Sequence, residues 1–221
     1  MGLDLYLDTA DRTEWDALLP TGLFTGITTN PLLAQRAGLR YPEIDWGTLA
    51  DHAAGLGARE FHAQVAGPVE GYVDFARTLY RVGKDAGIRT VVKIPLTEDG
   101  IRATPAIRDL DGPILMTACY DPKQMFVATA LGAEYIAPYF GRMLEAGMPA
   151  YDAMSEMRAI GLSAGGKTRV LIASLRNARQ MVELAARGQD CFTIAPAVAR
   201  ELLSDDRTLA AAAQFEEAAA S

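Results

Sequence analysis

The sequence predicts an α/β protein, a single (β/α)8 TIM barrel with an extra C-terminal helix. Short apolar runs alternate with amphipathic stretches along almost the whole chain, and there are eight such units. The 221 residues, half of them hydrophobic, are enough for one well-packed core and few for two domains. An open doubly wound sheet is the alternative, but eight similar units offer no point at which the winding would reverse.

Each apolar run has the length of a buried parallel strand. The predicted strands are residues 3–7, 24–28, 60–65, 90–95, 113–118, 134–138, 169–173 and 191–194. The stretches between them have helical periodicity. The predicted helices are residues 12–19, 45–56, 70–86, 98–109, 122–131, 151–161, 177–187 and 197–203.

The segment DDRTLAAAAQFEEAAA predicts one more helix, with Asp205 or Asp206 as its N-cap and alanines supplying helix propensity. We expect residues 1–204 to form the barrel and residues 205–221 a helical tail of the same domain. The tail either packs on the outer helices or on a neighbouring subunit, or it frays at its alanine-rich end.

Composition excludes several classes of partner. The net charge is −7 and no predicted helix carries a Lys/Arg cluster, which argues against nucleic acid and anionic membranes. No stretch is long and apolar enough to span a bilayer, and the N-terminus lacks a signal-peptide pattern, so we expect a soluble, cytoplasmic protein. Cys119 and Cys191 predict buried free thiols, and two histidines are too few for a His-rich metal site.

Lys93 is the most informative residue, because it is the only charged group within the apolar run TVVKIPL. Burial disfavours the charged form of lysine and lowers its pKa, which would make the amine a nucleophile toward carbonyl carbon at neutral pH. The chain has four lysines and seventeen arginines, and the other three lysines lie in helical or turn contexts. A snorkelling or ion-paired lysine remains the alternative.

In a barrel, residues at the carboxyl ends of the strands surround the active site. Seven predicted strands deliver polar groups to this rim. They are Asp8, Thr28, Asn30, Gln64, Lys93, Thr117, Tyr139, Arg142, Ser174 and Arg176. Taken singly, several have ordinary explanations, such as the turn signal of Asn30 before Pro31. Together they predict a reactive amine among proton-transfer groups, with two arginines and a serine to one side.

The segment GLSAGGKT at residues 161–168 matches the Walker A pattern letter for letter. Phosphate binding by that pattern requires a strand before the glycine loop and a helix after it. Here a helix precedes and the strand RVLIA follows, so the segment predicts a helix-to-strand loop and no nucleotide site.

Six segments in order, DLYLDTA, FTGITTNP, FHAQVA, VVKIPLT, EYIAPYFGR and VLIASLR, resemble the small transaldolase family, most closely its fructose-6-phosphate aldolase branch. The resemblance covers residues 3–203. It implies a Schiff-base lysine on the fourth strand, which agrees with Lys93. It also implies that Asp8 and Asn30 hold substrate hydroxyls and assist proton transfer, and that Arg142, Ser174 and Arg176 bind the substrate phosphate.

Two residues resemble the aldolase branch, namely Gln64 and Tyr139, where transaldolases carry Glu and Phe. A water held by Gln64, Thr117 and the Tyr139 hydroxyl would protonate the dihydroxyacetone enamine and release it. The resemblance therefore implies reversible cleavage of fructose 6-phosphate to dihydroxyacetone and glyceraldehyde 3-phosphate. It implies no metal or organic cofactor, small-molecule sugar phosphates as the partners, and a homo-oligomer.

Two other functions are retained as alternatives. The first is a transaldolase, which passes the dihydroxyacetone unit to an acceptor aldehyde. The second is a non-catalytic sugar-phosphate sensor, which has no need of a reactive lysine. His62, two residues before Gln64 on the same strand face, is either a hydrogen-bonded interior histidine or a group that tunes the shared water.

Overall fold

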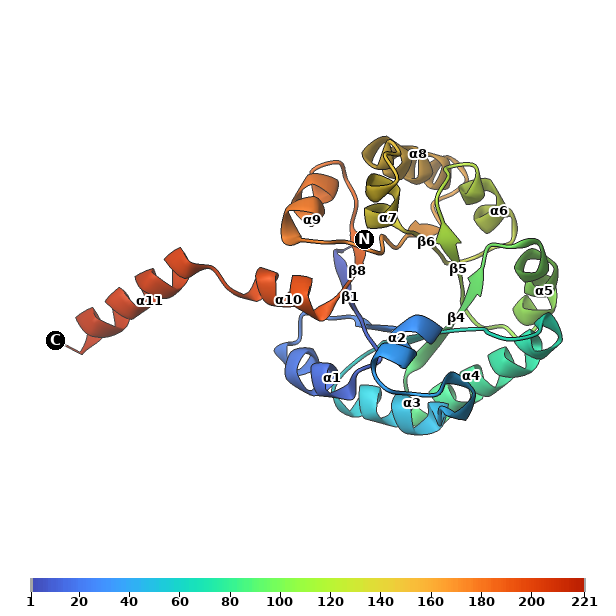
Figure 1. Cartoon of the computed structure of the whole chain (residues 1–221), viewed down its shortest axis with the longest axis horizontal. Coiled ribbons are helices and arrows are strands. Elements are labelled where there is room, and N and C mark those ends of the chain that lie inside the picture. Colours follow the sequence, from blue (N-terminus) through green and yellow to red (C-terminus); the bar gives the residue numbers. More distant parts are fainter. Residues whose placement is uncertain (1, 221) are drawn as a thin grey trace.

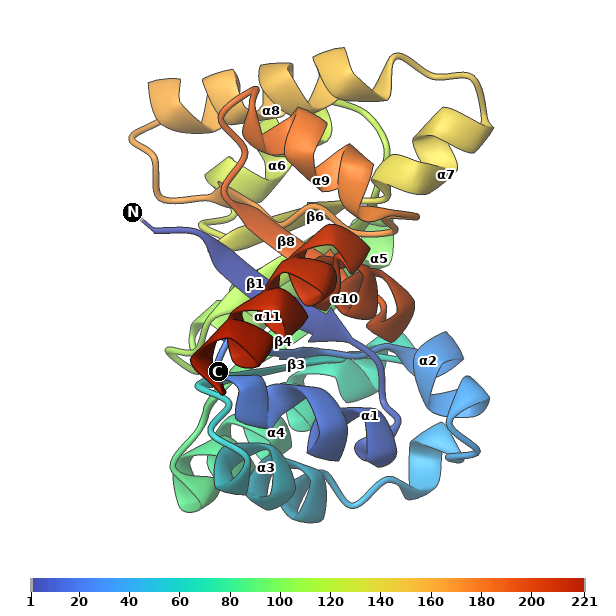
Figure 2. The same ribbon diagram turned by 90° about the vertical axis from the view of Figure 1, so that its left-hand side faces the viewer.

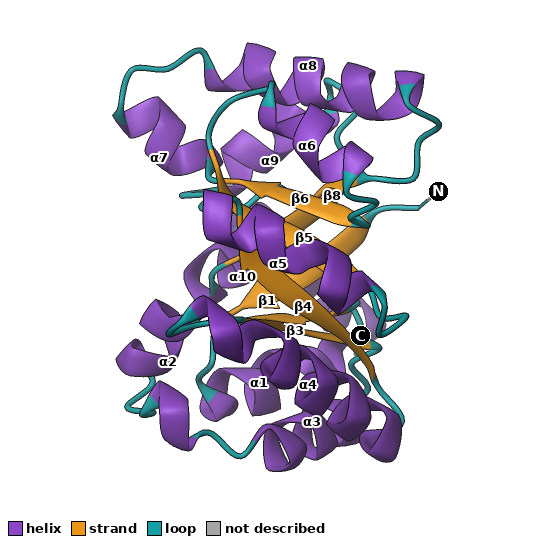
Figure 3. Cartoon of the chain, turned by 90° about the vertical axis from the view of Figure 1, so that its right-hand side faces the viewer, coloured by secondary structure: helices purple, strands orange, loops and turns teal. Residues whose placement is uncertain are grey.

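The computed structural model describes residues 2–220 and forms a (β/α)8 barrel, as predicted (Figures 1 and 3). The eight strands are parallel and follow the order β7-β6-β5-β4-β3-β2-β1-β8. A parallel bridge between Ile172 and Phe192 joins the two outer members and closes the ring. The closed ring excludes the open doubly wound sheet.

The strands lie close to their predicted positions. They are β1 (Asp4–Asp8), β2 (Gly26–Thr28), β3 (Glu60–Gln64), β4 (Arg89–Pro95), β5 (Ile114–Cys119), β6 (Tyr135–Pro138), β7 (Arg169–Val170) and β8 (Cys191–Ile194). Strand β7 is shorter than the predicted residues 169–173. Its continuation still lies in the wall, because Ala173 forms a bridge with Tyr139.

Eleven α-helices occur among residues 2–220. They are α1 (Arg12–Leu18), α2 (Pro31–Arg36), α3 (Trp46–Gly55), α4 (Tyr72–Ala86), α5 (Glu98–Arg108), α6 (Gln124–Ala130), α7 (Phe140–Glu145), α8 (Ala150–Ser163), α9 (Ala178–Ala185), α10 (Pro196–Leu203) and α11 (Asp206–Ala219). Helices α2 and α7 were not predicted. Both have six residues, too few to show helical periodicity, and both follow strands at the same end of the barrel (Figure 2).

The core has two layers. Inside the ring, the strands contribute the buried side chains of Tyr6, Val91, Leu115, Tyr135 and Leu171. Between the ring and the helices lies a larger apolar layer. Because both faces of each strand are covered, the strands appear in the sequence as continuous apolar runs and do not alternate with polar residues.

Helix α11 leaves the barrel and projects away from it (Figure 1). Asp205 is the N-cap and accepts a hydrogen bond from the Thr208 N–H at 2.9 Å. The helix buries no residue, and Leu209 and Phe215 are 62% and 71% exposed. Within this one chain, the tail therefore does not pack on the outer helices. Across residues 2–220, no helix has the length and apolarity needed to cross a membrane.

Candidate active site

The carboxyl ends of the strands surround a cavity of about 490 Å³. Nine of the ten predicted site residues line it, and they come from strands spread around the ring. These nine are Asp8, Asn30, Gln64, Lys93, Thr117, Tyr139, Arg142, Ser174 and Arg176. The tenth, Thr28, lies beneath the surface of the cavity and is fully buried.

Lys93 lies on β4, in register with Gln64 of β3 and Leu115 of β5, and is 5% exposed. No residue in the described part of the chain forms a hydrogen bond or ion pair with its amine. Burial lowers the pKa of Lys93, and the charge of Asp8 only partly offsets this effect. The ion-paired alternative is therefore wrong for this chain, and a larger fraction of the amine is neutral than in a solvated lysine.

Asp8 ends β1, and its carboxylate is held by the Thr28 hydroxyl, which is in turn bonded to Thr193. Thr28 Oγ1 donates to Asp8 Oδ1 at 2.6 Å, and Thr28 and Thr193 share a hydrogen bond of 2.5 Å. A threonine hydroxyl has one proton, so Thr193 donates to Thr28 while Thr28 donates to Asp8. These two hydrogen bonds orient the Asp8 carboxylate toward the cavity that also contains Lys93.

Tyr139 and Thr117 form the polar wall opposite Asp8. Their hydroxyl oxygens lie 3.4 Å apart, and burial raises the pKa of Tyr139, so the phenol keeps its proton at neutral pH. Just after Thr117 the register of β5 shifts, and Ala118 adopts a left-handed conformation with φ of 60°. The bulge changes the direction of β5 at the cavity wall.

Gln64 is fixed through its backbone by a residue from another element. The Tyr41 hydroxyl donates to the Gln64 carbonyl at 2.5 Å and accepts from the Gln64 N–H at 3.1 Å. Because both bonds use the main chain, the Gln64 amide side chain remains available to the cavity.

The predicted phosphate-binding residues form one side of the mouth. The Arg142 guanidinium lies over the Tyr139 ring, 4.9 Å from its centroid, and Arg176 Nε donates to Glu145 Oε1 at 2.7 Å. Helix α7 packs closely on the strand end behind them. A Cβ at Gly141 would lie 2.0 Å from the Ser174 carbonyl oxygen, so only glycine allows this approach.

Helix α2 brings a third arginine, Arg36, to the cavity, and the sequence analysis missed it. Asn30 is predicted as a site residue, with a turn before Pro31 as its ordinary explanation; in the structure its Oδ1 accepts from the Leu33 N–H at 3.0 Å and Pro31 is the first helical residue. An N-cap Asn followed by Pro is a helix-start signal, and it was the available clue. Within residues 2–220, Arg36 has no hydrogen bond or ion pair.

The lining is therefore strongly cationic in an acidic protein. Lys93 and three arginines line the cavity, and Asp8 is the one acidic side chain among the described residues that do so. Among these four basic residues, Arg176 alone has a carboxylate partner within residues 2–220. Such a surface attracts small anions even though the net charge of the chain is −7.

His62 is an interior residue with no exposure and does not line the cavity. Its Nε2 lies 2.9 Å from Glu60 Oε2, so Nε2 donates, and Nδ1 has no hydrogen-bond partner. Burial lowers the pKa of His62 more than Glu60 raises it. These contacts support the hydrogen-bonded interior histidine among the two alternatives.

Two further predictions can be compared with the structure. Cys119 and Cys191 are both buried free thiols. The Walker-like segment follows α8 and precedes β7, as predicted, which is the reverse of the order that phosphate binding by that motif requires.

Among residues 2–220, no group of three or more His, Cys, Asp or Glu side chains is arranged to hold a metal ion.

Comparison with known proteins identifies relatives of the whole chain. Residues 5–221 match the transaldolase/fructose-6-phosphate aldolase family. A probable transaldolase of Caulobacter vibrioides (strain NA1000 / CB15N) is 33% identical over 213 residues, covering 96% of this chain and 94% of the relative. A probable transaldolase of Phenylobacterium zucineum (strain HLK1) is 34% identical over 215 residues, with the same coverage.

A likeness to solved structures extends to the fold alone. A mandelate oxidase with a monooxide FMN adduct superposes with a TM-score of 0.60 at 14% identity. The alignment covers 88% of this chain and 65% of the oxidase, so this chain spans slightly less than two thirds of that protein. At such low identity the shared barrel carries no information about the reaction.

Proposed function

The chain belongs to the transaldolase/fructose-6-phosphate aldolase family, and we propose that it is a Schiff-base aldolase. Its reaction is the reversible cleavage of fructose 6-phosphate to dihydroxyacetone and glyceraldehyde 3-phosphate. The observation that carries this proposal is the buried, unpaired Lys93 amine, which shares a cavity with Asp8, Tyr139 and an arginine-rich rim. No step requires a metal or organic cofactor, because the protonated Schiff base is the electron sink.

The proposed reaction begins with the neutral Lys93 amine, which adds to the ketone carbon C2 and loses water to give an iminium ion. The Asp8 carboxylate takes the proton of the C4 hydroxyl as the C3–C4 bond breaks. Glyceraldehyde 3-phosphate leaves, and the bonding electrons form an enamine on Lys93. Asn30, at the edge of the cavity, hydrogen-bonds a substrate hydroxyl through the amide nitrogen that capping leaves free.

The fate of the enamine separates an aldolase from a transaldolase. In the aldolase, C3 must receive a proton so that hydrolysis can release dihydroxyacetone and restore the amine. The Tyr139 phenol, protonated at neutral pH, and the nearby Thr117 hydroxyl and Gln64 amide are suited to hold a water that delivers it. The transaldolase remains the second candidate, favoured by the names of the relatives, and there the enamine attacks an acceptor aldehyde.

The first experiment compares turnover of fructose 6-phosphate alone and with erythrose 4-phosphate added. Release of dihydroxyacetone without acceptor supports the aldolase, and an absolute requirement for acceptor supports the transaldolase. Borohydride reduction in the presence of dihydroxyacetone should attach a stable mass to the peptide that contains Lys93. Absence of any label would support the non-catalytic sensor.

The double variant Tyr139→Phe with Gln64→Glu should shift the balance toward transfer. It removes the proposed proton donor and introduces the carboxylate that the transaldolase branch carries. General acid-base catalysis contributes about 10²- to 10⁴-fold, which sets the expected loss of acceptor-independent cleavage, whereas borohydride labelling of Lys93 should persist. An unchanged ratio of cleavage to transfer would show that another group, such as Asp8, supplies the proton.

A further inference from the structure

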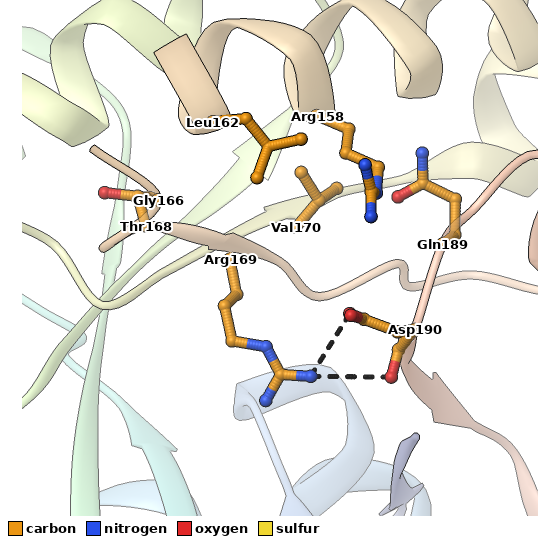
Figure 4. A pocket seen from close by; sticks show the side chains of 8 residues that line it. All are labelled: Arg158, Leu162, Gly166, Thr168, Arg169, Val170, Gln189 and Asp190. Carbon is orange, nitrogen blue, oxygen red and sulfur yellow. Dashed lines mark hydrogen bonds and ion pairs between the residues drawn. The ribbon is translucent and has the colours of Figure 1, made fainter. Parts of the chain in front are cut away.

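A second cavity, of about 200 Å³, lies at the amino end of β7, the opposite end of the barrel from the cavity that contains Lys93. Figure 4 shows the residues that line it. Its wall is formed by the end of α8, the loop after it, the start of β7 and the loop before β8. The loop is the glycine-rich segment that resembles a Walker A motif, and Leu162, Gly166 and Thr168 from this segment face the cavity. The segment therefore borders a hollow, although its helix-to-strand order is wrong for a nucleotide.

Arg158 supplies an unneutralised positive charge to this cavity. It is half-buried on α8, and in the described part of the chain it has no hydrogen bond and no ion pair. The turn before Gln189 packs against it: Gly188 has a φ of 87°, and a Cβ there would be in ordinary contact, at 3.5 Å, with the Arg158 guanidinium carbon.

The second arginine of the cavity is already paired. Arg169 bonds Asp4 Oδ2 at 2.5 Å and Asp190 Oδ1 at 3.2 Å, so two carboxylates, of which Asp190 also lines the cavity, more than balance its charge. A ligand entering the cavity therefore meets one free cation, Arg158, among the described lining residues.

Gln189 adds a free acceptor beside that cation. Its side chain is 4% exposed, and its Nε2 donates to the carbonyl of Met154, one helical turn before Arg158, at 2.9 Å. With the amide nitrogen engaged, Oε1 is the atom left for a ligand, and the amide and the guanidinium point toward one another in Figure 4. Leu162 and Val170 complete the wall with apolar surface.

We propose that this cavity is a binding site for a small hydroxylated organic anion, separate from the active site. The phosphate or carboxylate of the ligand pairs with Arg158, a ligand hydroxyl donates to Gln189 Oε1, and the carbon chain covers Val170 and Leu162. The volume equals that of six or seven liquid waters, at about 30 Å³ each, which suits a three- or four-carbon compound.

The test titrates the full-length protein with glycerol 3-phosphate in a calorimeter. The variant Arg142→Ala, which weakens the proposed active-site anion subsite, should keep one binding site, and addition of Arg158→Gln should weaken that site by about 10- to 100-fold. Inorganic phosphate should bind the site about 2- to 10-fold more weakly than glycerol 3-phosphate, because it offers no carbon-borne hydroxyl. Failure of the proposed aldolase reaction would leave these binding results unaffected.

Two controls separate a cavity from diffuse surface charge. Leu162→Trp fills the hollow without changing any charge and should abolish binding, whereas Arg81→Gln, on the exposed face of α4, should change nothing. Four results would overturn the proposal: no site on Arg142→Ala at millimolar ligand, full affinity after Arg158→Gln, full affinity after Leu162→Trp, or equal weakening by Arg81→Gln.

Discussion

The two ends of the barrel interior both contain charged groups, but those gathered around Glu60 at the amino ends of the strands are paired with one another. There, Glu60 accepts from Tyr6 at 2.9 Å, from His62 at 2.9 Å and from Arg89 at 2.6 Å, and Arg89 also pairs with Glu134. At the carboxyl ends, Lys93, Arg36 and Arg142 have no carboxylate partner within 4.0 Å among the described residues. Inside the ring, the same eight strands thus have an amino end suited to stability, called the closed end, and a carboxyl end suited to binding the proposed substrate, called the open end.

The pKa shifts of Glu60 and Lys93 show how the paired and the unpaired buried groups differ. Burial raises the pKa of Glu60, but the hydrogen bonds from His62, Arg89 and Tyr6 outweigh burial and lower the pKa to about 2. Lys93 has only the partial compensation that the Asp8 charge provides, and its pKa is lowered. At the amino ends of the strands Glu60 keeps its charge through its partners, whereas at the carboxyl ends burial disfavours the charge of Lys93 and favours the nucleophilic amine.

The largest expected effect is on activity at the open end. Lys93→Met should reduce cleavage and transfer by at least about 10³-fold, because the covalent nucleophile is lost. Its free energy of unfolding should stay equal or rise, since an apolar side chain replaces an unpaired buried amine. Steady-state kinetics and urea titration measure the two quantities. Retained turnover, or a large loss of stability, would assign Lys93 a structural role.

The next effect is on stability at the closed end. Glu60→Ala should lower the free energy of unfolding by about 3 to 5 kcal/mol, because it leaves His62, Tyr6 and part of Arg89 without their shared acceptor. The exposed pair of Arg81 and Asp85 provides the control, and Asp85→Ala should cost at most about 1 kcal/mol. Similar losses in both variants, measured by chemical denaturation, would mean that the buried network adds nothing beyond a surface ion pair.

A smaller effect is expected at the rim of the open end. Arg142→Ala should lower kcat/KM for phosphorylated acceptors by about 10- to 150-fold, from the loss of a charge-assisted hydrogen bond worth about 1.5 to 3 kcal/mol. Unphosphorylated aldehydes should be affected much less. Arg36→Ala, which removes an exposed cation from the other side of the mouth, should cost less than about 10-fold. Equal losses on both substrate types would make Arg142 a structural residue.

The smallest effect is the response of the closed end to acid. The pKa of His62 is lower in the folded than in the unfolded chain, so the unfolded chain binds more protons as the pH falls below the usual value of 6.5. Stability should therefore decline between pH 6.5 and 5 by up to about 1.4 kcal/mol per pH unit. His62→Phe should flatten this decline, and the Glu60 contribution should be lost only below its usual value of 4.5. Parallel pH profiles for wild type and His62→Phe would exclude His62 as the source.

The sequence by itself determined the barrel and most of the open end. Strand number, strand order and the nine lining residues follow from local signals, because a buried parallel strand is a continuous apolar run and the residues at and just after its carboxyl end surround the active site. Lys93 stands out for the same reason, as a charge inside such a run. These features depend on residues that are close together in the sequence, so they can be predicted from the sequence alone.

Only the tertiary structure decided which charges find partners. Tyr6, Glu60 and Tyr135 are 54 to 129 positions apart, yet their side chains share one hydrogen-bonded cluster. Arg176 is paired and Arg142 is not, although both were predicted alike. Pairing depends on strand register and on the close approach of short helices such as α2 and α7, and neither leaves a periodic pattern in the residues themselves. Which charged side chains are paired at each end of the barrel is therefore decided only when the ring of strands has closed.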